Sequence, residues 1–273
     1  MTTSFALPSW KSYHLLHAAV LPMSEPKKAF WQAMRAVVCG FVSHAAYAHA
    51  ASVAATQRWA SPRLEQRLAE QLAHDINPVS NLLREARDAA DFRARWNGFN
   101  AGARLGISTH VEPDGRLRRL PALSVRDVGF RAEVIAGCLD LLTSRRPPAM
   151  GIHALAQTLG APASVVDLMD HLQAAPADSL SDCAQALGCA ARSLQRALAR
   201  EYLSFGLVRQ ALRLVTAGER LRHCDETVTE TALAAGFFDA AHLNHAWMQA
   251  CGLTPSAYSA LARTPAAVDP ISA

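Results

Sequence analysis

A chain of 273 residues, with 51% hydrophobic and 18% charged side chains, has enough apolar material for two ordinary folded domains. Its composition excludes an intrinsically disordered or low-complexity protein. Residues 151–273 hold eight basic and eleven acidic side chains, a net charge of −3, so residues 1–150 carry +7 of the formal total of +4. Six cysteines without a C-x-x-C pair, in a chain whose N-terminus lacks a signal-peptide pattern, predict buried thiols in a reducing cytoplasm.

The longest uncharged segment covers residues 36–57 and is long enough to cross a lipid bilayer. A membrane-spanning helix needs about twenty strongly apolar residues, whereas two His, three Ser or Thr and many weakly apolar Ala dilute this segment. We therefore expect a buried helix of a soluble domain here, and no membrane partner.

Helix formers with apolar residues three and four positions apart predict helices within residues 25–55, 61–76 and 90–107. Two helix starts are marked by a capping side chain directly before a Pro, at Ser61 and at Asn77. The first half of the chain is therefore expected to be mostly helical.

Residues 107–123 interrupt this helical pattern. Asp114-Gly115 separates two short runs there, which predicts a β-hairpin. Another helix is expected over residues 131–144, and the Pro- and Gly-containing segment at 145–151 is the best domain boundary in the chain.

One local pattern, A-x-x-x-G, occurs three times beyond that boundary, at residues 156–160, 184–188 and 232–236. Small residues let two helices approach closely, and Gly allows the left-handed turn that ends the first of them. Such a helix–turn–helix unit presents its second helix to the major groove of DNA. Acidic residues and no basic residue follow the first copy, so chance in an Ala-rich chain explains that copy equally well.

Two longer motifs surround the second and third copies, SLSDCAQALGCAARSLQRALARE and DETVTETALAAGFFDAAHLNHAWMQACGLTPSAY. The second motif matches a V-x-x-I-A-x-x-x-G-F and G-x-T-P-x-x-Y signature at these positions: Val228, Ala232, Gly236, Phe237, Gly252, Thr254, Pro255 and Tyr258. With these motifs, residues 179–263 resemble the DNA-binding domain of the AraC/XylS family of bacterial transcription regulators.

The resemblance implies two helix–turn–helix units joined by a helix over residues 205–223, which read successive major-groove turns of double-stranded DNA. It also implies contact with RNA polymerase. The chain contains no G-x-S-x-G, Walker-type or dinucleotide-binding motif, so we expect no enzyme and no cofactor. Its His pairs lack further ligands at recognisable spacing, so no metal site is expected.

The recognition helix of the first unit is expected over residues 191–201. Arg192 and Arg196 are four positions apart and share one helix face, where Arg can pair with guanine or phosphate and Gln with adenine. Leu194 and Leu198 are expected to face the core. The candidate DNA contacts of this unit are Arg192, Ser193, Gln195, Arg196 and Arg200. Solvated surface charge is the alternative explanation for the arginines.

The chain departs from the family pattern in both reading helices. Ala190 stands where the family generally has Ser, which removes a helix-capping hydroxyl. The second recognition helix, expected over residues 240–250, contains no Lys or Arg, and His245 replaces an outward Arg. Its core positions are kept as Leu243 and Trp247. The candidate contacts of this unit are Asp239, His242, Asn244 and His245.

The fold class is thus expected to be mainly α. It comprises a helical regulatory domain with one β-hairpin and an all-α domain of two helix–turn–helix units with their linker helix. The expected organisation is a regulatory or effector region at 1–145, a linker with an extra helical pair at 146–178, the DNA-binding domain at 179–263 and a tail at 264–273. Residues 25–145 of the first region weakly resemble a subgroup with helical effector regions, which implies a small-molecule effector or a homodimer.

The best hypothesis is a cytoplasmic, effector-responsive transcription activator in which the first unit supplies affinity and the second supplies shape and neutral contacts. Two linked weak readers also gain from effective concentration. The rival hypothesis is a degenerate member of the family that acts through protein–protein interaction, with weak or no DNA binding. Salt dependence separates the two, because binding to several phosphates weakens steeply with salt.

Overall fold

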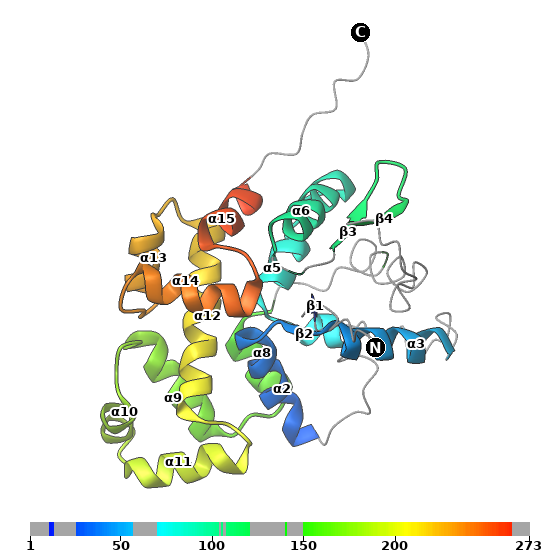
Figure 1. The fold of residues 1–273 in the computed structure, drawn as a ribbon. Helices are drawn as coiled ribbons and strands as arrows, with labels where there is room; N and C mark the ends of the chain where they lie inside the picture. Colours follow the sequence, from blue (N-terminus) through cyan, green and yellow to red (C-terminus); the bar gives the residue numbers. More distant parts are fainter. Residues whose placement is uncertain are drawn as a thin grey trace, which may run out of the picture.

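The structure is a computed structural model that describes residues 11–13, 26–56, 70–103, 105, 108–120, 140 and 150–263 (Figure 1). Its elements in chain order are β1 (Lys11–Tyr13), α2 (Pro26–Val38), β2 (Phe41–Ser43), α3 (His44–Thr56), α5 (Pro78–Arg84), α6 (Ala89–Gly102), β3 (Ser108–Val111), β4 (Leu117–Leu120), α8 (Ile152–Thr158), α9 (Ala163–Ala174), α10 (Leu180–Ala186), α11 (Ala191–Arg200), α12 (Phe205–His223), α13 (Val228–Ala234), α14 (Ala240–Cys251) and α15 (Pro255–Arg263). The predicted mainly α fold class is confirmed. The helix start expected at Ser61, nearly all of the helix expected over 131–144 and the tail at 264–273 lie outside the described residues.

The uncharged segment at residues 36–57 is not one helix, which corrects the expectation from its composition. The first helix ends at Val38, β2 then pairs antiparallel with β1, and α3 begins only at His44. The break lies at Gly40, where a Cβ atom would be 2.4 Å from the carbonyl oxygen of Ala250. The backbone of α14 passes so close that a side chain at position 40 would collide with it, which accounts for Gly at this position. No described helix is both long and apolar enough to cross a membrane.

The hairpin predicted around Asp114-Gly115 is confirmed as β3 and β4, with Gly115 in the left-handed region at φ 81°. It is held against α6 by two side chains of that helix. The indole of Trp96 donates to the carbonyl of Thr109 at 2.9 Å, and the amide of Asn97 bridges both backbone groups of Val111 at 2.8 Å. The sheet of β1 and β2 is an addition that the sequence analysis missed.

The helix start predicted at Asn77 is confirmed, and it lies at the centre of the molecule. The side-chain Oδ1 of Asn77 accepts from the N–H of Val79 at 2.9 Å, which caps α5. The side-chain amide of Asn77 donates to the carbonyl of Ala36 in α2 at 2.9 Å and to that of Ala250 in α14 at 3.2 Å. One buried side chain therefore joins α2 and α5 of the N-terminal half to α14 near the C-terminus.

Among the described residues, one apolar core runs through both halves of the chain. The long helix α12 packs against α2, α5, α9, α13 and α15 (Figure 1). The fully buried Tyr258 of α15 donates its hydroxyl to the carbonyl of Pro78 at 2.7 Å. Arg222 of α12 pairs with Glu85 at 3.0 Å and donates to the Tyr258 hydroxyl at 2.9 Å. The N-terminal region is thus built onto α12, α14 and α15.

Residues 152–174 form a helical pair, α8 and α9, around the first A-x-x-x-G copy. The Gly that ends each copy lies in the left-handed region, with φ of 67° at Gly160, 65° at Gly188 and 82° at Gly236. Further along, α9 packs against α10, α11 and α12. The first copy therefore has the same turn as the other two and supports the next helical unit.

The five described cysteines are free thiols, but not all of them are buried. Cys183 and Cys251 are buried as expected, whereas Cys39 and Cys189 are exposed. The expectation of buried thiols is therefore wrong for these two positions, which lie in the connections after α2 and after α10.

Candidate nucleic-acid interface

The first helix–turn–helix unit consists of α10, a turn at Gly188 and α11. The hydroxyl of Ser179 accepts from the N–H of Asp182 at 3.3 Å, and the Asp182 carboxylate accepts from the N–H of Ser179 at 2.9 Å. This capping box fixes where α10 begins. The Ser179 hydroxyl and N–H hold the pKa of Asp182 below its ordinary value, because both hydrogen bonds favour the charged carboxylate.

The recognition helix of this unit, α11, has one buried face and one exposed face. Leu194 and Leu198 are buried, as predicted. All five candidate DNA contacts are exposed: Arg192, Ser193, Gln195, Arg196 and Arg200. None of these five forms a hydrogen bond or ion pair with another described residue through its side chain. Ala190 precedes the helix without a side-chain cap, as the missing hydroxyl predicted.

The second unit has the same construction, with α13, a turn at Gly236 and α14. Thr227 and Glu230 form a second capping box, in which the Glu230 carboxylate accepts from the N–H of Thr227 at 2.8 Å. The ring of Trp247 is fully buried and meets Tyr258 edge-on, with ring centroids 4.9 Å apart. Leu243 is buried beside it, which confirms both predicted core positions.

The four candidate contacts of the second unit are all exposed, but two of them also have structural partners: Asp239, His242, Asn244 and His245. Asp239 caps α14 by accepting from the N–H of His242 at 2.7 Å. The Nδ1 of His242 accepts from the N–H of Phe238 at 3.4 Å, and its ring packs edge-on against Phe237. Both partners lie next to the first turn of α14, so these contacts hold the His242 ring at the start of the second recognition helix.

Phe238 is an exposed residue at this surface that the sequence analysis passed over. Its side chain is 84% exposed, in the turn directly before Asp239 and the first turn of α14. The sequence does contain an indication of this exposure, which is the pair of adjacent aromatic residues Phe237 and Phe238. Phe237 fills the core at 3% exposure, so its neighbour is available for the surface. Leu233 of α13 is 58% exposed nearby in the sequence.

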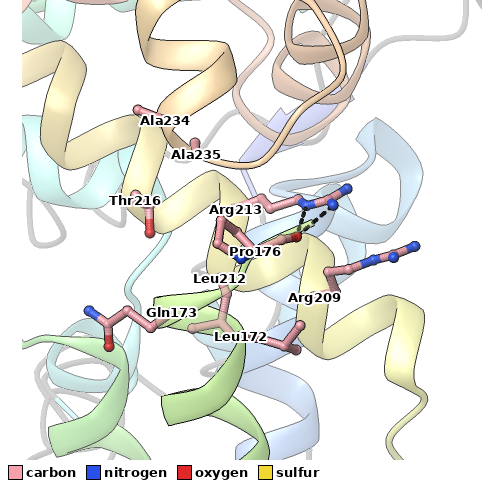
Figure 2. A pocket seen from close by; sticks show the side chains of 9 residues that line it. All are labelled: Leu172, Gln173, Pro176, Arg209, Leu212, Arg213, Thr216, Ala234 and Ala235. Atoms are coloured by element: carbon pink, nitrogen blue, oxygen red, sulfur yellow. Dashed lines mark hydrogen bonds between the residues drawn. The ribbon is translucent and has the colours of Figure 1, made fainter. Parts of the chain in front are cut away.

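Two arginines of the linker helix line a small pocket between α9, α12 and α13 (Figure 2). Arg213 donates through Nε and Nη2 to the carbonyl of Pro176, at 3.2 and 2.7 Å, and lies over the ring of Phe237. Burial lowers the pKa of Arg213, and the neighbouring Arg209 adds to this shift. Arg213 therefore ties the segment before the first unit to the turn of the second unit.

His171, Asp178 and Cys183 bring potential metal-ligand atoms within 4.8 Å of one another among the described residues. The His171 Nε2 lies 2.8 Å from the Asp178 carboxylate, and this contact joins the end of α9 to the segment before α10. Burial raises the pKa of the Cys183 thiol, and the charge of Asp178 raises it further. Nothing beyond these three side chains indicates a metal here, so the absence of a metal site stays a prediction from the sequence.

A family model described as a helix-turn-helix domain matches residues 183–260. Among solved structures, the chain is similar to the transcriptional regulator CdpR from Pseudomonas aeruginosa, with 14% sequence identity and a TM-score of 0.32 over 88% of this chain and 99% of that chain. No curated protein matches the sequence. The helix-turn-helix domain that the two motifs predicted is confirmed over residues 183–260, and it is of the AraC type.

Proposed function

We propose that this transcription regulator recognises a specific DNA sequence and that its first helix–turn–helix unit supplies most of the affinity. The observation that carries the proposal is the contrast between the two recognition helices. The first exposes Arg192, Arg196 and Arg200 without ion-pair partners among the described residues, whereas the second contains no Lys or Arg. Each Arg that reaches a phosphate releases counterions and adds to affinity.

The second unit then contributes shape and uncharged contacts. Asn244 and His245 are exposed on α14 and can donate to base edges, as Ser193 and Gln195 can on α11. Phe238, at the start of α14, suits an apolar contact with the methyl group of a thymine. Asp239 takes part by capping the helix rather than by binding phosphate, which its carboxylate would repel.

The N-terminal region, 1–145, serves as an effector region in this proposal, and the protein acts in the cytoplasm as an activator that contacts RNA polymerase. The packing of α2 and α5 against α12 and α14 supports a route from this region to the second unit. A homodimer would strengthen weak binding by one copy, because the second binding event becomes intramolecular.

The rival function, a protein-interaction module without DNA binding, draws on the exposed Phe238 and Leu233. Apolar side chains of this size at a surface are typical of protein interfaces. The two functions differ in their salt dependence, because an apolar interface releases few counterions.

The test is selection of binding sites from a random duplex DNA library, followed by fluorescence anisotropy at several salt concentrations. We expect Arg192→Ala/Arg196→Ala to weaken binding and to reduce the slope of log affinity against log salt by about 0.9 for each phosphate that these arginines neutralise in the wild type. Arg116→Ala is the matched control, because the Arg116 side chain is 85% exposed at the hairpin tip, far from both units in sequence. Selection of no preferred sequence by the folded protein would favour the rival function.

A further inference from the structure

Arg84, the last residue of α5, is a buried cation with unused donors. The residue is only 5% exposed. Its Nη1 donates to the side-chain carbonyl of Asn81 at 3.5 Å. Its Nε and Nη2 are buried and have no hydrogen-bond partner in the described part of the chain. Such groups are rare in folded proteins, because a buried donor without an acceptor loses its hydration and gains nothing.

Asp75, the acidic residue whose charge acts on this guanidinium, does not pair with it directly. The carboxylate of Asp75 accepts instead from the hydroxyl of Tyr13 at 3.0 Å, from the hydroxyl of Ser80 and from the N–H of Asn77 at 3.0 Å. Burial lowers the pKa of Arg84, while the charge of Asp75 opposes this shift from a distance. A guanidinium remains charged even so. Arg84 is therefore a buried positive charge whose close partner is not among the described side chains.

We propose that Arg84 binds the carboxylate of a small organic acid. Nε–H and Nη2–H lie side by side on one edge of the guanidinium, and two parallel donors match the two oxygens of a carboxylate. One negative charge balances one guanidinium. A phosphate dianion would bring a second charge toward Asp75 and is disfavoured for that reason. The inference rests on the proposed effector response, for which it names the class of ligand.

The position of Arg84 connects a ligand bound there with the DNA-binding domain through direct contacts. It ends α5, a single helix whose residues are all buried. At the other end of α5, the Asn77 amide holds the carbonyl of Ala250 at the end of α14. The residue after Arg84 is Glu85, which pairs with Arg222 of the linker helix. A carboxylate bound at Arg84 therefore acts on α5, which packs against α12 and is joined to the second recognition helix by the Asn77 amide.

The experiment measures thermal unfolding of the full chain with acetate, butyrate and benzoate, each beside its neutral amide at equal concentration. Wild type is compared with Arg84→Met, which keeps much of the length of the side chain and removes its charge and donors. We expect a saturable rise of Tm with at least one carboxylate, no rise with its amide, and no rise in Arg84→Met. Without ligand, Arg84→Met should unfold at the same temperature as wild type or higher, because an unpaired buried charge is removed. Arg116→Met, at the exposed hairpin tip, should respond to carboxylate as wild type does.

Two results would overturn the proposal. One is equal stabilisation of wild type and Arg84→Met by every carboxylate in the panel, or stabilisation of neither. The other is a marked fall in the Tm of ligand-free Arg84→Met, which would assign the side chain a purely structural role. Anisotropy with the selected DNA distinguishes these failures from failure of the proposed function. Arg84→Met should still bind DNA without a carboxylate, whatever the outcome of the binding panel.

Discussion

Replacing Asn77 with Ala tests whether the N-terminal region and the second recognition helix are joined through this one side chain. The change removes the cap of α5, which typically costs about 1 kcal/mol. It also leaves the carbonyls of Ala36 and Ala250 without the amide that donates to them, and unpaired buried polar groups cost about 1–3 kcal/mol. We therefore expect the free energy of unfolding to fall by about 3 kcal/mol, or Tm by roughly 6–12 °C.

Urea unfolding followed by circular dichroism measures this decrease, and Asn77→Ser separates its two parts. Ser keeps a capping oxygen for α5 but cannot reach both carbonyls, so it should recover only about 1 kcal/mol. A decrease below about 1 kcal/mol for both variants would show that the hydrogen bonds of the Asn77 amide do not couple the two regions. Equal decreases for both variants would instead show that the cap contributes nothing.

Three further outcomes follow from local features. Ala190→Ser should supply the missing cap of α11 and raise the free energy of unfolding by about 0.5–1 kcal/mol, as measured in urea. The capping boxes lower the pKa values of Asp182 and Glu230. The stability that these two carboxylates add to the fold is therefore complete above the ordinary carboxyl pKa and is lost as pH falls through the lowered values. With Asp182→Asn and Glu230→Gln, Tm should therefore fall less steeply than in wild type as the pH is lowered below about pH 4. Phe238→Ala should change stability by less than about 0.5 kcal/mol yet remove a thymine preference from the selected DNA sites, as uracil in place of that thymine would do.

The resemblance to the family, together with helical spacing, was sufficient to predict which side chains of the two units face inward. Leu194 and Leu198 in α11, and Leu243 and Trp247 in α14, are buried as that resemblance implied. The turn glycines were predictable as well, because a left-handed residue between two helices is best supplied by Gly. These features depend on neighbours within a few residues, so a single sequence contains the information for them.

The features that the sequence analysis missed depend on packing between distant segments. Position 40 requires Gly because the carbonyl oxygen of Ala250 is 2.4 Å from where a Cβ atom would lie. Nothing in residues 36–57 themselves reveals that approach. The sequence around Arg84 likewise does not distinguish it from an ordinary helix-ending cation, since Lys and Arg are favoured in the last turn of a helix. Only the packing of α5 among other helices shows that it is buried.

The same packing explains why α14 keeps the shape of a recognition helix after losing its positive charge. Trp247 meets Tyr258, and the carbonyl of Ala250 receives the Asn77 amide, so the fold requires α14 whether or not it touches DNA. The exposed arginines of α11 have no such structural role among the described residues, where neither Arg192 nor Arg196 forms an ion pair. Retention of α14 is therefore weak support for base reading by the second unit. The exposed arginines of the first unit are the stronger support for DNA binding. Substitutions in α11 are therefore the more decisive test of it.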